Sequence, residues 1–282
     1  MLREYQPCNI VAEACCNHLG NIQIAEEMIV TAKICGADYI KFQKRCPEIS
    51  VPKNLQNKPH PNPSNAFGKT YNEHRKALEF NIEQHKYLKS ICEKTGIKYA
   101  CSVWDVVSAD EIISLNPEYI KLPSAMNNDF DLIEHVYRKY NGNVHISLGM
   151  ATKKEQKELL EYIKPFSNRT VLYWTTSGYP VKFEELFLLE IQKLTKFKCH
   201  LGYSGHHLGI AVDTVAYTLG ATWIERHFTL DRTWKGTDQA ASLEPSGLQK
   251  LCRDIKACQK SLKFKKSITQ DEKENRKKLR IK

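Results

Sequence analysis

The sequence lacks several features that would assign the protein to a membrane, secreted or disulfide-rich class. No apolar run of about 18 residues occurs in the 282-residue chain, so we expect no transmembrane helix. Residues 1–16 hold no charged segment followed by a long apolar one, and we therefore expect no signal peptide. The ten cysteines contain no CxxC pair, which favours reduced thiols in a cytoplasmic protein over a disulfide framework.

The cysteines are instead scattered among apolar neighbours, as Cys8, Cys35 and Cys92 show. Cys15 and Cys16 are adjacent, which is a poor geometry for a disulfide between them. We interpret both as packing residues.

Positive charge is distributed unevenly along the chain. The formal net charge is +10, and residues 261–282 hold nine Lys and Arg residues against three Asp and Glu residues, which accounts for +6 of it. The remainder is only mildly basic, so the pattern predicts a solvated terminal helix or frayed terminus and no nucleic-acid partner. A mild positive excess also suits an anionic, phosphorylated substrate.

Short apolar runs alternate with amphipathic segments along the chain. We predict strands over 9–15, 38–43, 97–103, 119–123, 143–148, 170–175, 200–204 and 223–227. We predict helices over 22–35, 82–95, 106–115, 130–140, 152–164, 183–194, 210–219 and 245–261. Residues 44–65 hold five of the eleven prolines and are predicted as a loop that could act as a lid.

This alternation predicts the fold class and the domain organisation. Eight strands with intervening helices favour an α/β fold, a (β/α)8 TIM barrel, over an open sheet. We expect a single barrel domain over residues 1–262 and a basic C-terminal tail over 263–282.

Polar side chains gather where the predicted strands end. The active site of a (β/α)8 barrel lies at the carboxyl ends of its strands, so these side chains should share one face. They are Glu13, Lys41, Gln43, Ser102, Lys121, Ser124, Ser177, Tyr179, Ser204, His206, Glu225 and His227. A purely structural barrel would have no reason to bury them together.

The chemistry of these residues leaves alternatives open. Two neutral imidazoles, His206 and His227, follow consecutive strands and could converge on a metal ion, or each could be a hydrogen-bonded structural residue. Lys41 and Lys121 could hold a phosphate or carboxylate as point charges, pair with nearby carboxylates, or act as a Schiff-base nucleophile. Asp238 could belong to a turn or could bind substrate hydroxyls.

Motifs across nearly the whole chain resemble those of the sialic acid synthases. The matching stretches are AEACCNHLGN, GADYIKFQ, YIKLPSAMNN, ISLGM, TTSGYPV, GYSGHHLG, LGATWIERHFTLDR and KGTDQAASLEP. The resemblance implies a (β/α)8 catalytic barrel that condenses phosphoenolpyruvate with an N-acylated hexosamine, or its 6-phosphate, and releases phosphate.

The resemblance also implies roles for single residues. His206 and His227 match the two protein ligands of a divalent metal ion, usually manganese, with magnesium or cobalt as alternatives, and Glu13 matches the acidic residue beside the metal-bound water. The positions that hold phosphoenolpyruvate are here Lys41, Ser102, Lys121, Ser124 and Ser204. Those that hold the sugar are Gln43, Tyr179 and Asp238.

Three departures from the family pattern stand out. Met126 replaces a residue that is usually acidic, and Ser177, which we count among the substrate-binding residues, replaces a frequent Asn. The printed sequence ends at Lys282, before the small antifreeze-like domain that in many members adds an arginine to the sugar site. The sugar specificity and the homodimer that the resemblance implies therefore stay open.

Two rival functions remain beside the synthase. One is a Schiff-base aldolase that uses Lys41 or Lys121. The other is a degenerate barrel that binds a ligand without catalysis, which Met126 and the missing domain suggest. We expect phosphoenolpyruvate and an amino sugar as ligands, with no nucleic-acid or membrane partner.

Overall fold

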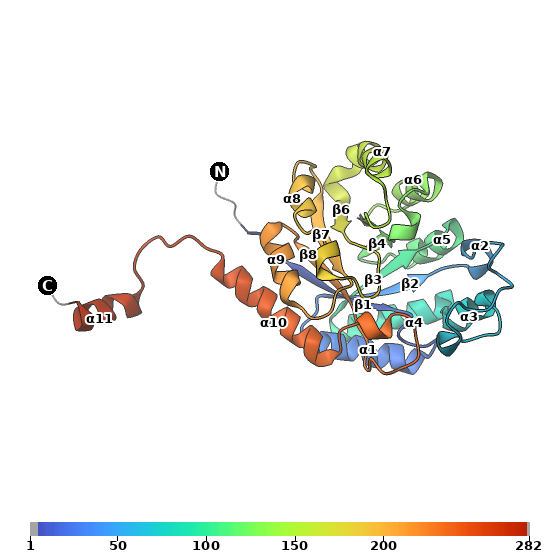
Figure 1. The fold of residues 1–282 in the computed structure, drawn as a ribbon, viewed down its shortest axis with the longest axis horizontal. Coiled ribbons are helices and arrows are strands. Elements are labelled where there is room, and N and C mark those ends of the chain that lie inside the picture. The colour runs from blue at the N-terminus through green and yellow to red at the C-terminus, as the bar shows by residue number, and fades with distance from the viewer. Residues whose placement is uncertain (1–4, 281–282) are drawn as a thin grey trace.

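Eight short segments rich in β-branched and aromatic residues form parallel strands that close into a barrel in sequence order (Figure 1). We describe residues 5–280 of this computed structural model. The strands are β1 (Asn9–Cys15), β2 (Tyr39–Lys44), β3 (Lys98–Val103), β4 (Tyr119–Leu122), β5 (Asn143–Ser147), β6 (Thr170–Trp174), β7 (His200–Gly205) and β8 (Trp223–His227). The predicted (β/α)8 barrel is confirmed.

Helices connect the strands and cover the outside of the barrel (Figure 1). They are α1 (Ile22–Cys35), α2 (Pro47–Ser50), α3 (Tyr71–Leu78), α4 (Ile82–Thr95), α5 (Val106–Ser114), α6 (Phe130–Lys139), α7 (Lys153–Ile163), α8 (Glu190–Leu194), α9 (Ala211–Leu219), α10 (Pro245–Ser261) and α11 (Gln270–Leu279). Helices α10 and α11 follow the last strand, and α11 lies away from the barrel, as Figure 1 shows. A capping box begins α7, because the side chains of Thr152 and Glu155 bond each other's backbone N–H groups. Gly220 ends α9 at a φ of 121°.

The buried apolar side chains form two clusters, one outside the barrel wall and one inside it. The larger hydrophobic core lies between the strands and the surrounding helices. A smaller cluster inside the barrel contains Val11, Tyr39, Ala100, Tyr119, Val171, Tyr173 and Trp223. His145 stacks on Tyr119 with ring centroids 3.6 Å apart and closes this aromatic floor.

The floor determines which residues form the next layer. Side chains two positions apart on a strand point to the same face. Glu13 therefore follows Val11 into the barrel, Lys41 follows Tyr39, and Lys121 follows Tyr119. A layer of charged groups thus lies directly above the aromatic floor, toward the carboxyl ends of the strands.

Two predictions about connecting segments need correction. The 44–65 segment, predicted as a loop, contains α2 and a 3-10 turn, η1 (Pro63–Asn65), and α3 beyond it was not predicted. The signal for α3 was a capping box formed by Thr70 and Glu73. The lid role of this segment stays a prediction.

The helix predicted over 183–194 is wrong as a continuous element. A 3-10 turn, η4 (Phe183–Glu185), and α8 are separated by Phe187, which adopts a φ of 46°. The carbonyl of Leu186 accepts a hydrogen bond from the indole of Trp174 at 2.8 Å, and that of Glu185 accepts one from the hydroxyl of Thr176 at 2.8 Å. These two carbonyls therefore accept hydrogen bonds from the end of β6 and the loop that follows it, in place of backbone N–H groups of a helix.

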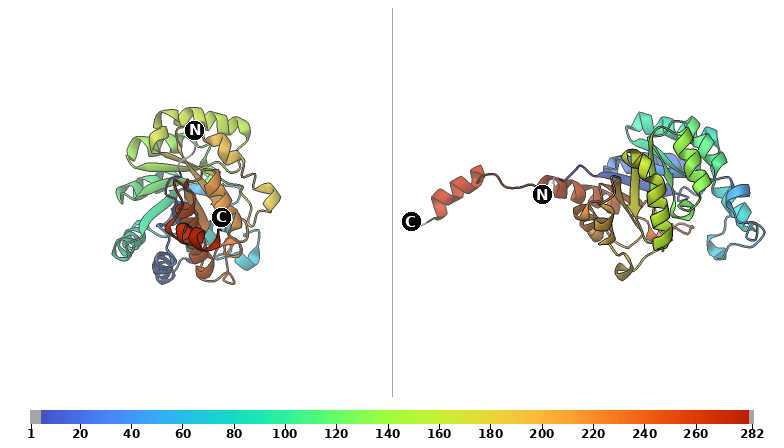
Figure 2. Two further views of the ribbon diagram at one scale, coloured as in Figure 1. Left: turned by 90° about the vertical axis from the view of Figure 1, so that its left-hand side faces the viewer. Right: turned by 90° about the horizontal axis from the view of Figure 1, so that it is seen from above.

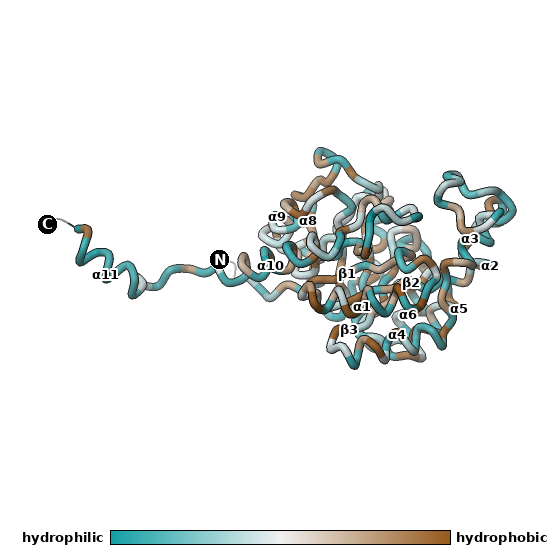
Figure 3. The backbone as a smooth tube through the Cα atoms, turned by 90° about the horizontal axis from the view of Figure 1, so that it is seen from below, coloured by the Kyte–Doolittle hydropathy of each residue, from teal (hydrophilic) through white to brown (hydrophobic). Residues whose placement is uncertain are grey.

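The C-terminal segment extends away from the barrel and ends in α11 (Figure 2). All residues from 263 to 280 are exposed, and the tube of this segment is largely hydrophilic (Figure 3). This exposure supports the division at residue 262, which stays a prediction. Within residues 5–280, no helix combines the length and apolarity that crossing a bilayer requires.

Removal of residues 264–282 is expected to change the free energy of unfolding by less than about 0.5 kcal/mol, because exposed residues contribute little. Urea melts of the truncated and full chains would measure the difference. As a control, a cut before Ile255, which is buried in α10, should unfold the protein. A loss above about 2 kcal/mol on the shorter cut would show that the tail packs on the barrel.

Candidate active site

The charged layer opens into a cavity of about 300 Å³ at the carboxyl ends of the strands. Every predicted site residue except Asp238 lines it, Glu225 included, together with Trp104, Pro123, Ala125, Ser147, Met150 and Thr175. The predicted strand-end residues therefore do converge. Asp238 lies beside the cavity and accepts a hydrogen bond from the thiol of Cys15.

Lys41 is the centre of a buried ionic network. Its ammonium group pairs with Glu13 Oε2, lies 3.8 Å from Glu225 Oε2, and donates a hydrogen bond to Ser102 Oγ at 2.7 Å. Burial opposes the charged form, but the two carboxylates outweigh it and raise the pKa of Lys41. This lysine is therefore held as a fixed cation.

Lys121 shares Glu225 with Lys41. Its Nζ lies 2.5 Å from Glu225 Oε1, which also accepts a hydrogen bond from Ser204 Oγ at 3.1 Å. Burial would raise the pKa of Glu225, but Lys121 and Lys41 lower it to about 2. Burial and the nearby ammonium of Lys41 together lower the pKa of Lys121, despite the attraction of Glu225.

The two predicted metal-binding histidines lie side by side above this network. The ring centroids of His206 and His227 are 5.3 Å apart, and the half-exposed ring of Tyr179 lies 4.4 Å from that of His206. Nδ1 of His206 is 2.9 Å from the carbonyl oxygen of Thr176, so Nε2 is the nitrogen left for a ligand. Burial, helped by His227, lowers the pKa of His206 to about 3.

Cys15 belongs to this site, and its interpretation as a packing residue is wrong. The thiol donates a hydrogen bond to Asp238 Oδ2 at 2.9 Å and accepts one from Gln43 Nε2 at 3.0 Å. Gln43 also donates to Glu13 Oε1 at 2.8 Å. A signal was present in the sequence, because Cys15 stands two positions after Glu13 at the end of the same strand.

Comparison with known proteins decides the family. The model of the NeuB family matches residues 28–267, which is most of the chain. The chain belongs to the NeuB family. It is 38% identical to N-acetylneuraminate-9-phosphate synthase of Mus musculus over 258 residues, which cover 91% of this chain and 71% of that protein.

Other similar proteins carry the names of synthases of sialic-type acids. This NeuB protein is 34% identical to N,N'-diacetyllegionaminic acid synthase of Legionella pneumophila, with 88% of this chain and 71% of that one covered. The N-acetylneuraminic acid synthetase of Leptospira borgpetersenii, solved in complex with citrate, has a TM-score of 0.81 at 29% identity. That match covers 98% of this chain and 94% of the other.

Two serines complete the cavity of the NeuB barrel on the β5 side. A Cβ added to Gly149 would lie 2.5 Å from Ser177 Oγ and 2.6 Å from Ser124 Oγ, so both hydroxyls closely approach a bare backbone. Met126, one of the departures named in the sequence analysis, packs against the hydrophobic core. It therefore lies outside the group of polar residues.

Arg45 and Trp104 were missed by the sequence analysis. Trp104 lines the cavity, and the guanidinium carbon of Arg45 lies 4.1 Å from its ring centroid. Arg45 also donates a hydrogen bond to Gln43 Oε1 and forms an ion pair with Glu79 at 2.7 Å. It thereby orients Gln43, and no short motif marks such a residue.

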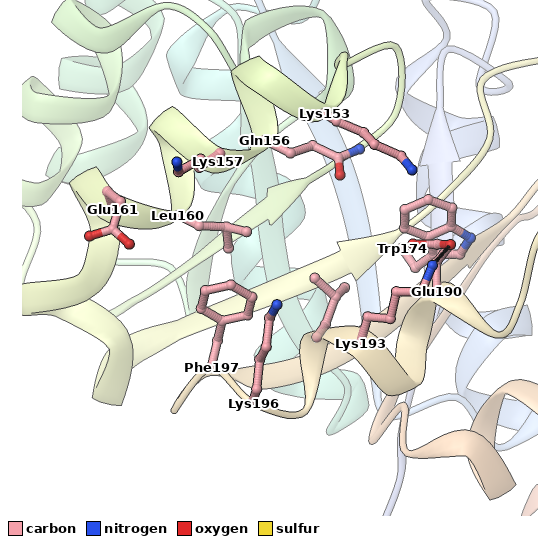
Figure 4. Close-up of a pocket in the computed structure, with 11 residues that line it drawn as sticks. Lys153, Gln156, Lys157, Leu160, Glu161, Trp174, Glu190, Lys193, Lys196 and Phe197 are labelled. Carbon is pink, nitrogen blue, oxygen red and sulfur yellow. Dashed lines mark hydrogen bonds and ion pairs between the residues drawn. The ribbon is translucent and has the colours of Figure 1, made fainter.

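A second hollow, of about 240 Å³, lies outside the barrel between α7 and α8 (Figure 4). Its walls carry Lys153, Lys157, Lys193 and Lys196 beside Trp174 and Phe197. Lys193 forms an ion pair with Glu190 on the same helix. These are solvated helix faces, whereas the strand-end cavity gathers buried charges, so the strand-end cavity is the candidate active site.

Proposed function

We propose that this protein is a nonulosonic-acid synthase that condenses phosphoenolpyruvate with an N-acylated hexosamine, or its 6-phosphate, and releases inorganic phosphate. The observation that carries the proposal is the buried Lys41, Lys121, Glu13 and Glu225 network beneath two histidines in a NeuB-family barrel. Synthases of sialic-type acids are the named relatives of the chain.

The lysines suit the anionic substrate. Lys41 and Lys121 lie at the bottom of the cavity, each paired with a buried carboxylate, and the hydroxyls of Ser102, Ser124 and Ser204 lie around them. Such preorganised donors would hold the phosphate and carboxylate groups of phosphoenolpyruvate without reorganisation during the reaction. Gln43, Ser177, Tyr179 and Asp238 would bind the sugar nearer the mouth.

The histidines fit a divalent metal ion. The carbonyl of Thr176 orients His206, and Nδ1 of His227 is buried without a hydrogen-bond partner among the described residues. We propose that His206 and His227 hold manganese, with magnesium or cobalt as alternatives. When bound, the ion would polarise the aldehyde oxygen of the open-chain sugar.

The residues of the charged layer would assist the bond-forming and bond-breaking steps. The methylene carbon of phosphoenolpyruvate forms a bond to the aldehyde carbon, water adds to the resulting cationic carbon, and phosphate leaves with its bridging oxygen. Glu13, held by Lys41 and Gln43, would position that water and accept its proton. Lys41 and Lys121 would stabilise the departing phosphate.

One observation favours a Schiff-base aldolase as a second candidate. The lowered pKa of Lys121 makes its neutral, nucleophilic amine more accessible than that of an ordinary lysine. Borohydride reduction with a keto-acid substrate would trap an imine on Lys121 in the aldolase. The condensation forms no imine, so absence of the trapped adduct supports the synthase.

The test of function is phosphate release from phosphoenolpyruvate in the presence of manganese and a panel of N-acetylated hexosamines, free and 6-phosphorylated. We expect release that depends on one sugar and stops when a chelator removes the metal. Release without any sugar, or release that a chelator leaves unchanged, would contradict the proposal. Phosphoenolpyruvate binding with no release across the panel would favour a degenerate barrel.

The setting of the enzyme is also a proposal. All ten cysteines are free thiols, which supports a reducing, cytoplasmic compartment. The homodimer stays a prediction, which light scattering of the purified protein would test.

A further inference from the structure

We propose that Cys15 is a thiolate ligand of the divalent metal ion, in one donor set with His227 and Asp238. This inference rests on the proposed function for the presence of a metal, and it adds a sulfur ligand to the two histidines. It concerns which ion this chain selects.

The three donors already lie within reach of one ion. A ligand atom from each of Cys15, His227 and Asp238 falls within 4.8 Å of the other two. Metal–ligand distances are about 2.3 Å for sulfur and about 2.0–2.2 Å for nitrogen and oxygen, so an ion placed among them needs only small side-chain shifts.

Independent evidence for a ligand comes from His227. The side chain is only 6% exposed, and its Nδ1 is a buried polar atom without a hydrogen-bond partner among the described residues. A buried polar atom without a partner is destabilising, so this nitrogen is available to bind a ligand.

The backbone of Cys15 is held in an unusual conformation. Its φ is 45°, in the left-handed region that non-glycine residues rarely adopt, and the β1–β2 register shifts between Glu13 and Cys15. Such a strained conformation tends to persist where it serves a functional site. Here it keeps the thiol on the same side as Glu13, beside Gln43 and Asp238.

The thiol of Cys15 and the carboxylate of Asp238 are in direct hydrogen-bond contact. A single proton bridges sulfur and carboxylate oxygen at 2.9 Å, two groups that are both metal ligands once that proton is gone. Binding of a divalent cation would replace this proton, which leaves to solvent, and would connect the same two atoms.

A sulfur ligand changes the expected ion preference. Thiolates favour softer ions, and divalent ions bind more tightly from manganese to cobalt. A site made of His206 and His227 alone already binds cobalt more tightly than manganese, and a thiolate ligand should widen that difference. With Cys15 in the set, this chain should prefer cobalt or zinc over manganese more strongly than its Cys15→Ser variant does.

Cobalt spectroscopy tests the ligand without any activity measurement. The full chain, stripped with a chelator and loaded with Co²⁺, should show a near-ultraviolet thiolate-to-cobalt charge-transfer band. The band should be lost in Cys15→Ser and retained in Cys16→Ser, the matched neighbouring thiol. The affinity of Cys15→Ser for Co²⁺ should fall by about 10- to 100-fold or more, and that for Mn²⁺ by less.

A second variant and a second measurement guard against misfolding. Cys15→Gly accepts a φ of 45° without strain and should also lose the band. In the zinc-loaded native protein, X-ray absorption should detect one sulfur at about 2.3 Å. A native spectrum without the band, a band that survives in Cys15→Ser, or a shell of nitrogen and oxygen alone would overturn the proposal.

These results separate the ligand from the enzyme activity. A cobalt band that depends on Cys15, in a protein that releases no phosphate, would uphold the ligand and reject the synthase. Sugar-dependent release in a protein without the band would do the reverse.

Discussion

Replacement of His227 by Ala should lower sugar-dependent phosphate release by about 1,000-fold or more, which corresponds to about 4 kcal/mol of transition-state stabilisation. His227 is the one side chain common to the histidine pair and to the Cys15–Asp238 group. Its loss therefore removes a ligand from any metal bound there. Steady-state rates at saturating phosphoenolpyruvate and manganese would measure the effect.

A matched histidine provides the control. His200 is exposed at the opposite, amino-terminal end of β7, so His200→Ala should leave the rate within about twofold of the native value. Thermal melts should show that both variants are folded. A fully active His227→Ala protein would show that His227 has no metal role.

Replacement of Glu225 by Gln should destabilise the protein by about 3–5 kcal/mol, because it leaves the ammonium of Lys121 buried without its closest counter-charge. The same substitution should also reduce the loss of folding stability at acidic pH. The pKa of Glu225 is about 2 in the folded protein against 4.5 for the ordinary group, so the unfolded chain binds the extra proton first. The carboxylate thus stabilises the fold above about pH 5, and this contribution, on the order of 3 kcal/mol, is lost as the pH falls toward 2.

Urea melts between pH 3 and pH 7 would measure both effects. The native protein should lose stability more steeply on acidification than Glu225→Gln. Glu158→Gln is the control, since the exposed Glu158 lies 3.9 Å from Lys154 and should contribute less than about 1 kcal/mol. Equal acid dependence in the native and Glu225→Gln proteins would contradict the assignment of the buried carboxylate.

The barrel and most of its site were predictable because both depend on local periodicity. Period-two alternation in β1, β2 and β4 places Glu13, Lys41 and Lys121 on the inner face, and parallel closure brings their strand ends together. The order of the strands was therefore enough to predict that the charged groups lie together. Which groups pair, such as Lys121 with Glu225 across the barrel, is seen only in the three-dimensional structure.

The features that were missed depend on contacts between distant segments. Cys15 and Asp238 are 223 positions apart, and only the closed barrel brings the thiol to the carboxylate. The break before α8 arises because Trp174 and Thr176 bond the carbonyls of a segment whose composition favours helix. Residue types alone do not indicate which distant segment supplies the hydrogen-bond partner in either case.

The aromatic floor closes the barrel on the side opposite the mouth of the cavity. Tyr39, Tyr119 and Trp223 pack against one another with centroids 5.0–5.6 Å apart, so the lysines can be approached only through the mouth that the histidines and Tyr179 border. A molecule bound to Lys41 and Lys121 must enter before a molecule that contacts Tyr179. The second molecule then blocks the exit of the first. With the substrates placed as proposed above, we expect ordered binding, in which phosphoenolpyruvate binds first and the sugar second.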